Sequence, residues 1–165
     1  MCASVALTWG LTVSATTRAP RKGEVDGVNY FFLTREEFDR RVANGEFVEW
    51  AEVHGNCYGT LVSEVQSKLA SGSSLILEID VQGALQVKER FPEAVLIFIK
   101  PPSLEVLRER LVGRGTETPE TIELRMANAA DELALADRYD DVVVNDDLDR
   151  ATDELVRVLD MHERI

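Results

Sequence analysis

A short basic segment near the start of the chain carries side chains that suit phosphate binding. Within residues 12–30 stand the cations Arg18, Arg21 and Lys22 and the hydroxyl side chains of Ser14, Thr16 and Thr17. The planar guanidinium group of arginine can donate to two phosphate oxygens at once, and it stays charged at every relevant pH. We expect these cations to have no acidic partner and to bind an anion. A solvated basic turn after a strand is the alternative interpretation.

Glu49 is a candidate for reading a nucleotide base. It belongs to an alternating segment at 47–53, where the period of two places it on one face with Phe47 and Ala51. A carboxylate enclosed on that face would need a partner. It can accept two parallel hydrogen bonds from the N1–H and 2-amino groups of guanine, whereas adenine has no such pair of donors. A half-exposed strand glutamate is the alternative.

Two hydroxyl side chains follow shortly after Glu49. Tyr58 and Thr60 lie in the sequence HGNCYGT and can offer their hydroxyls to a phosphate and a base. A glycine-punctuated hairpin explains the same sequence without a ligand.

Three apolar segments rich in β-branched residues predict buried strands, at 74–79, 94–100 and 141–145. Each is followed by a helical segment, and these segments begin near Gly83, Ser103 and Asp149. Alternating strands and helices indicate an α/β fold with a parallel sheet, and such sheets bind ligands at the carboxyl ends of their strands. Asp80 occupies such an end, as do Asn145 and Asp146, although Asn and Asp also terminate strands for ordinary turn reasons.

Two insertions into this pattern are predicted. The first is a small, partly antiparallel subdomain at about 30–62, which includes a helix with the capping-box pair Thr34 and Glu37 at its start. The second, at about 113–126, has glycines on both sides of Arg114 and then Thr118, which can cap a helix that begins at Pro119. This second insertion suits a hinged lid that carries a charge, and a plain surface loop is the alternative.

Composition narrows the class of protein. The chain has 165 residues, of which 45% are hydrophobic, which is enough for one well-buried core. Its net charge of -12 argues against binding to nucleic acid or to anionic membranes. Residues 116–165 hold fifteen acids and five bases, whereas residues 1–115 hold fifteen acids and thirteen bases. A phosphate ligand is therefore compatible with the first part of the chain.

Other kinds of site have no support in the sequence. Cys2 and Cys57 form no disulfide or metal-ligand pattern, and we expect a protein of the reducing cytoplasm. His54 and His162 have no sequence-defined partner, so we predict no metal site. The apolar run at 1–11 lacks the basic leader and the length of a secretory or membrane-spanning segment, so we expect a soluble protein.

Taken in order, these motifs resemble those of the guanylate kinase family. The resemblance covers residues 11–165 and rests on the successive sequences SATTRAPRKGEVDGVNYFF, GEFVEWAEVHGNCYGT, LEIDVQG, PPS, GRGTET and VVVNDDL. It implies a P-loop-kinase-like α/β core with a GMP-binding subdomain and a lid. It also implies transfer of the γ-phosphoryl group from ATP to GMP, which gives ADP and GDP and requires Mg²⁺.

The resemblance further implies a role for each matching residue. The implied GMP site consists of Ser14, Arg18, Arg21, Tyr30, Glu49, Tyr58, Thr60 and Asp80. Within it, Glu49 and Thr60 are expected to read guanine, and the phosphate is expected to contact Arg18, Arg21, Tyr30 and Tyr58. The implied catalytic residues are Arg21 and the lid arginines Arg114 and Arg125. Arg114, Asn145 and Asp146 are expected to lie beside ATP.

The chain departs from the family at its start. In guanylate kinases a strand, a glycine-rich phosphate loop with its lysine, and a long helix precede the segment that matches TVSATTR. Residues 1–10 do not resemble them, and the pattern GxxxxGK[ST] occurs nowhere in the sequence. We therefore expect the first strand, the P-loop and the first helix to be missing and this chain, as written, to be inactive as a kinase. A non-catalytic guanylate-kinase-like binding module is the alternative.

Overall fold

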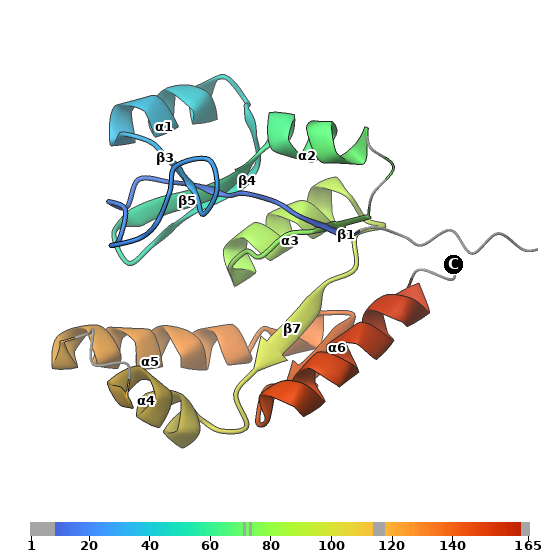
Figure 1. Ribbon diagram of the computed structural model, residues 1–165. Coiled ribbons are helices and arrows are strands. Elements are labelled where there is room, and N and C mark those ends of the chain that lie inside the picture. Colours follow the sequence, from blue (N-terminus) through green and yellow to red (C-terminus); the bar gives the residue numbers. More distant parts are fainter. Residues whose placement is uncertain (1–8, 71, 73, 114–117, 163–165) are drawn as a thin grey trace, which may run out of the picture. The chain divides into compact units, whose positions relative to one another are not determined.

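The structure is a computed structural model that describes residues 9–70, 72, 74–113 and 118–162. Its internal contacts divide the chain into two compact units, Met1–Pro92 and Glu93–Ile165. Each unit combines strands with helices (Figure 1), which confirms the predicted α/β class.

A mixed four-stranded sheet forms the centre of the first unit. Its strands lie in the order β3-β2-β5-β4, with bounds Ala15–Thr16 for β2, Phe31–Phe32 for β3, Phe47–Val53 for β4 and Asn56–Leu61 for β5. β2 is parallel to β3 and antiparallel to β5, and β4 and β5 form an antiparallel hairpin. The two turn residues of this hairpin, His54 and Gly55, have φ values of 52° and 78°, as a tight two-residue hairpin turn requires.

Helix α1 (Arg35–Ala43) packs against this sheet (Figure 1). It begins where the sequence predicts, because the hydroxyl of Thr34 accepts a hydrogen bond of 3.1 Å from the N–H of Glu37. Phe38 is fully buried under the helix, and its ring stacks on that of Phe47 with 4.5 Å between centroids. The core around this pair consists of Ala15, Cys57 and Leu61, with Phe31, Leu33 and Val42 at its border.

The remaining elements of the first unit surround a short parallel pair of strands. β1 (Trp9–Leu11) pairs with β6 (Ser74–Ile76), which is shorter than the predicted strand at 74–79. α2 (Val62–Leu69) precedes β6, and α3 (Val81–Arg90) follows it and packs on β4.

A β-bulge in β4 changes the predicted faces of this strand. The register of its pairing with β5 shifts by one residue between Phe47 and Glu49. Phe47 and Trp50 consequently both contact the ring of Phe38 under α1, with 4.5 and 6.4 Å between centroids, whereas Glu49 lies against α3. The prediction that Phe47 and Glu49 share a face is therefore wrong, because the bulge inserts one residue between them.

The second unit has a parallel pair of strands covered by helices. β7 (Ile97–Lys100) pairs with β8 (Asp141–Val144), and the helices are α4 (Leu104–Gly113), α5 (Pro119–Leu133), the short 3₁₀ helix η1 (Ala136–Arg138) and α6 (Leu148–His162). α5 begins at the predicted proline, and Thr118 caps it by accepting from the N–H of Thr121. His162 at the end of α6 bonds to Asp141 of β8 at 2.7 Å, so this histidine holds the helix to the strand.

The predicted core strands do not all join one sheet in the described residues. β6 pairs with β1, and β7 pairs with β8. A parallel pair needs only a crossover connection between two strands, and an apolar β-branched run does not determine which strand becomes its neighbour. In the described part of the chain, no helix has the length and apolar character needed to cross a membrane.

Candidate functional site

Arg18 has an acidic partner, contrary to the expectation for the basic segment. Its guanidinium group makes two hydrogen bonds to Glu24, of 2.9 Å from Nη2 to Oε1 and 3.1 Å from Nη1 to Oε2. Both side chains are largely buried, with 15% and 18% exposed. The same carboxylate also accepts a bond of 2.6 Å from the N–H of Arg21. Glu24 therefore closes the turn that holds both arginines, because one carboxylate binds the side chain of the first and the backbone of the second.

The pair also shifts the acid–base properties of its members. The hydrogen bond to Glu24 is the main cause that raises the pKa of Arg18, and Tyr58 raises this pKa further. The bond from Arg18 in turn lowers the pKa of Glu24 below its ordinary value, and the N–H of Arg21 adds to that lowering. The sequence analysis did not identify Glu24 as the partner of Arg18. The available signal was that an acid follows this arginine by six residues within the same turn.

Aromatic rings enclose the buried arginine. The guanidinium carbon of Arg18 lies 5.4 Å from the ring centroid of Tyr30 and 5.9 Å from that of Phe32. Tyr30 in turn makes an edge contact with Tyr58 at 6.2 Å. The structure thus brings three predicted phosphate ligands together, on the loop before β3 and on β5, while the Arg21 side chain stays exposed.

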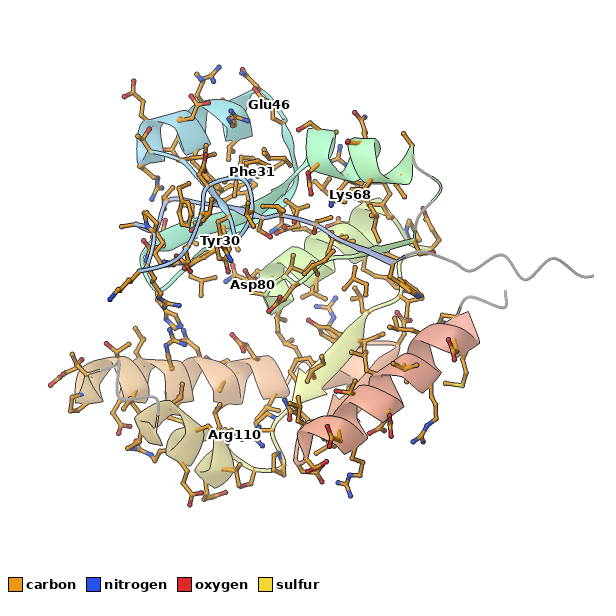
Figure 2. All side chains as sticks on the ribbon, in the orientation of Figure 1. Tyr30, Phe31, Glu46, Lys68, Asp80 and Arg110 are labelled. Atoms are coloured by element: carbon orange, nitrogen blue, oxygen red, sulfur yellow. The ribbon has the colours of Figure 1, made fainter. Side chains whose placement is uncertain are left out.

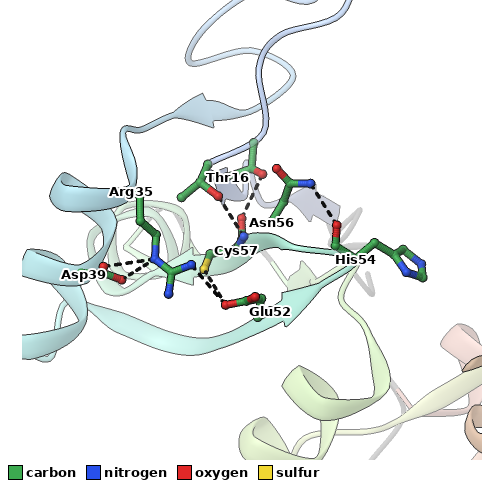
Figure 3. A network of polar contacts seen from close by, with 8 residues as sticks. Thr16, Arg35, Asp39, Glu52, His54, Asn56 and Cys57 are labelled. Atoms are coloured by element: carbon green, nitrogen blue, oxygen red, sulfur yellow. Dashed lines mark hydrogen bonds and ion pairs between the residues drawn. The ribbon is translucent and has the colours of Figure 1, made fainter. Parts of the chain in front are cut away.

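The hydroxyls near the arginines have structural partners. Thr16 donates to the carbonyl of Cys57 at 3.0 Å, and Thr17 accepts from its N–H at 2.9 Å (Figure 3). These threonines therefore fix β2 to β5, which leaves them poorly suited to surround a phosphate as predicted. Ser14 uses its backbone carbonyl to pair with Phe31 of β3 at 2.9 Å.

A second polar network, around Arg35, binds α1 to the hairpin (Figure 3). Arg35 donates to Asp39 at 3.0 Å and to Glu52 of β4 at 3.1 Å. The buried thiol of Cys57 lies 4.0 Å from a carboxylate oxygen of Glu52, and burial is the main cause that raises the pKa of this thiol. This network stabilises the packing of the helix on the sheet and was not foreseen from the sequence.

Glu49 is the most unusual side chain of the first unit. It is only 3% exposed, and its neighbour across the hairpin, Thr60, is fully buried. Within the described part of the chain, Oε1 of Glu49 and the hydroxyl of Thr60 both lack a hydrogen-bond partner. Two adjacent buried polar atoms without partners carry a large free-energy penalty unless a ligand satisfies them.

Asp80 lies at the start of α3 (Figure 2), near enough to Glu49 for its charge to act on that carboxyl group. Its carboxylate caps the helix by accepting bonds of 2.7 and 3.0 Å from the N–H groups of Gln82 and Gly83. Burial is the main cause that raises the pKa of Glu49, and the charge of Asp80 raises it further, while Thr60 opposes the shift. Glu49, Thr60 and Asp80 thus form one cluster between β4, β5 and α3.

The predicted ATP-side residues all belong to the second unit. The N–H of Asn145 bonds to the carbonyl of Lys100 at 2.8 Å, which extends the ladder between β8 and β7. Asp146 forms an ion pair with Arg150, and its carbonyl accepts a bond of 3.2 Å from Arg110. Asn145 and Asp146 thus follow the end of β8, where Asn145 has a contact with β7 and Asp146 has contacts with α6 and α4.

The structure describes one of the two predicted lid arginines. Arg125 lies half-buried on α5, and Arg114 lies outside the described residues. In the described part of the chain, no three His, Cys, Asp or Glu side chains are grouped so as to hold a metal ion.

Comparisons with known proteins give a consistent result. The family model for guanylate kinase matches residues 3–162. A guanylate kinase of Halalkalibacterium halodurans is 55% identical over 148 residues, which cover 90% of this chain and 72% of that protein. One from Gloeobacter violaceus is 57% identical over 149 residues, which cover 90% and 73%.

A solved structure agrees with these relatives. The crystal structure of guanylate kinase from Anaplasma phagocytophilum superposes with a TM-score of 0.77 and 40% sequence identity, covering 93% of this chain and 75% of that one. The span matched by the family model, residues 3–162, runs through both units. This chain belongs to the guanylate kinase family.

Proposed function

We propose that the chain binds GMP in its first unit, as the acceptor of the γ-phosphoryl group of ATP, in a reaction that gives ADP and GDP. We also propose that the 165-residue polypeptide by itself binds GMP without completing this transfer, because its residues contain no GxxxxGK[ST] loop to hold the ATP phosphates. The observation that carries this proposal is the pair of buried, unpartnered oxygens on Glu49 and Thr60. Guanine offers N1–H and 2-amino donors side by side, and a carboxylate can accept both. Adenine offers no matching pair, so the same buried carboxylate discriminates against AMP.

The phosphate of GMP is assigned to the basic segment. Arg18 is held in place by Glu24 and enclosed by Tyr30, while Tyr58 brings a second phenol to the same side chain. Arg21 is exposed and linked to the same turn through its backbone, so its guanidinium group is free to meet a phosphate. An arginine already held by its partner loses little conformational freedom when the ligand binds.

The other half of the reaction is assigned to the second unit. Arg114 and Arg125 are proposed to close on the phosphates during transfer, and Asn145 and Asp146 to lie beside ATP. Phosphoryl transfer needs little covalent help and depends on alignment and on positive charge around the transferred group. Mg²⁺ is counted here as part of the ATP complex and would neutralise the charge of its phosphates. We place this reaction in the cytoplasm.

The acceptor site can be tested without turnover. Calorimetric titration of the 165-residue polypeptide should give a GMP affinity greater than its AMP affinity by a factor approaching about 10⁴, because AMP leaves the buried carboxylate unmatched. Equal affinities for the two nucleotides would contradict the assignment of Glu49. The same titration at a higher salt concentration should give a lower affinity for GMP, since salt screens the contacts with the phosphate.

A further inference from the structure

Helix α3 is fastened to the edge of the sheet by two long side chains. Among the described strands β4 lies at the edge of its sheet, so its outer backbone groups have no neighbouring strand there. The amide of Gln86 takes the place of that strand at Trp50, donating to its carbonyl at 2.7 Å and accepting from its N–H at 3.3 Å. Arg90, one turn further along α3, donates to the carbonyl of Phe47 at 3.1 Å. These bonds fix the distance between the helix and the strand.

Gly83 lies one turn before Gln86, on the same face of α3, and is buried. A Cβ atom added at this position would lie 2.4 Å from Oε2 of Glu49, 3.1 Å from its Cδ and 3.5 Å from its Cγ. All three of the nearest atoms belong to this one side chain. The backbone of Gly83 is helical and does not require glycine, and glycine destabilises a helix interior relative to alanine. Glycine at this position therefore leaves open the space that the side chain of Glu49 occupies.

A Cβ atom at position 83 would have to displace the carboxylate. The helix cannot move away from the strand without losing the bonds of Gln86 and Arg90. The backbone of Glu49 cannot move, because it is paired with Thr60 inside the hairpin. The side chain of Glu49 is the remaining element that can shift, and its buried oxygen would leave its place beside the Thr60 hydroxyl.

We propose that Gly83 is a positioning residue that determines nucleotide specificity, because the space above its Cα holds the carboxylate of Glu49 where both guanine donors can reach it. This inference rests on the proposed function, in which Glu49 reads guanine. IMP is the matched probe, because hypoxanthine keeps the N1–H of guanine and lacks the 2-amino group. A displaced carboxylate loses the geometry for two parallel bonds, so its preference for GMP over IMP disappears first.

The test measures the affinities of GMP, IMP and guanosine by calorimetry for the wild type, Gly83→Ala and Gln82→Ala. Gln82 is the exposed neighbour on α3, and its backbone N–H still caps the helix in the variant. In Gly83→Ala the GMP-to-IMP affinity ratio should fall by at least about tenfold, while the GMP-to-guanosine ratio, which reports on the phosphate, stays within about twofold. Gln82→Ala should leave both ratios unchanged. A folded Gly83→Ala protein that keeps the wild-type GMP-to-IMP ratio would overturn the inference.

A double-mutant comparison separates this inference from the proposed function. If the contact is with Glu49, Gly83→Ala lowers the melting temperature in the wild-type background and has almost no effect in the Glu49→Ala background, where the clashing atoms are gone. This comparison also applies if Gly83→Ala alone does not fold. In that case the inference predicts that adding Glu49→Ala restores stability, and a double variant that is no more stable than Gly83→Ala overturns it. Wild-type protein that binds GMP and IMP equally would contradict the guanine-reading role of Glu49 itself, and the specificity claim with it.

Discussion

Replacing Glu49 with glutamine should strengthen the fold and weaken GMP binding at the same time. In the folded protein the pKa of Glu49 is raised above its ordinary value of 4.5, mainly by burial and then by the charge of Asp80. A carboxyl group with a raised folded-state pKa contributes stability below the unfolded-state pKa, and this contribution is lost as the pH rises through the folded-state value. Above that folded-state pKa the wild type carries an unfavourable buried charge, which Glu49→Gln removes.

The magnitudes follow from the burial and from the missing partner. Glu49 is 3% exposed and its Oε1 is unpartnered. An unsatisfied buried polar group costs about 1–3 kcal/mol, which a glutamine amide still carries, and a charged group costs more, so the substitution removes only the added cost of the charge. We expect Glu49→Gln to raise the free energy of unfolding by about 1–3 kcal/mol at pH 7 and by little below pH 4.5. Loss of a charged hydrogen bond costs about 1.5–3 kcal/mol, so GMP affinity should fall about 10- to 150-fold.

Urea unfolding followed by tryptophan fluorescence measures the first effect, because both tryptophans, Trp9 and Trp50, belong to the first unit. Calorimetry with GMP measures the second. Glu52→Gln is the matched control, since this carboxylate lies on the same strand, is half-exposed and pairs with Arg35 on the surface. A Glu49→Gln protein that is less stable than the wild type at pH 7, or that binds GMP as tightly, would refute the reasoning.

Three other predictions concern separate parts of the chain. In calorimetric titrations, Arg21→Ala should lower the affinity for GMP about tenfold and the affinity for guanosine much less, because the proposed partner of Arg21 is the phosphate. Thr118→Ala should destabilise α5 by about 1 kcal/mol, because the hydroxyl that caps the helix is lost, and thermal unfolding followed by circular dichroism measures this change. The purified 165-residue polypeptide should form no measurable GDP from GMP and ATP with Mg²⁺ in a coupled assay, because its residues contain no GxxxxGK[ST] loop to hold the ATP phosphates.

Each of these predictions has a defined contrary result. Equal losses of GMP and guanosine affinity in Arg21→Ala would remove this side chain from the phosphate site. An unchanged melting curve for Thr118→Ala, compared with Thr152→Ala within α6, would show that the cap contributes nothing. Robust turnover by a preparation free of host kinase would show that the phosphates of ATP are held without such a loop.

Local features of the structure were well predicted because their causes are local. Thr34 and Thr118 mark helix starts, since a cap depends on one side chain and the N–H three residues later. Asp80 also caps a helix, α3, although the sequence predicted it only as a binding residue at the end of a strand. The hairpin at His54 and Gly55 follows from a short turn between two strands. The family itself was visible in the spaced motifs, which the comparisons confirm.

Other features depend on what lies across the fold. The alternation of β4 predicts the wrong face for Phe47, since a bulge is decided by the pairing with β5 rather than by the strand's own sequence. The partner of Arg18 was missed because the turn that brings Glu24 back to it forms only in the folded loop. Thr16 and Thr17 were predicted to surround a phosphate, yet their hydroxyls form hydrogen bonds with the backbone of Cys57 in the neighbouring strand.

By itself, the sequence determines the α/β class, the family and the residue types of the candidate nucleotide site, because these depend on periodicity and on the spacing of motifs along the chain. The tertiary structure alone decides that Glu49 is buried beside Thr60 without a partner for its Oε1, and that this carboxylate fills the space above Gly83. The physical reason is that burial and close contact depend on residues from different helices and strands, which are brought together only when the chain folds. The sequence shows that α3 contains a glycine at position 83, and only the folded structure shows that the carboxylate of Glu49 occupies the space of the missing side chain.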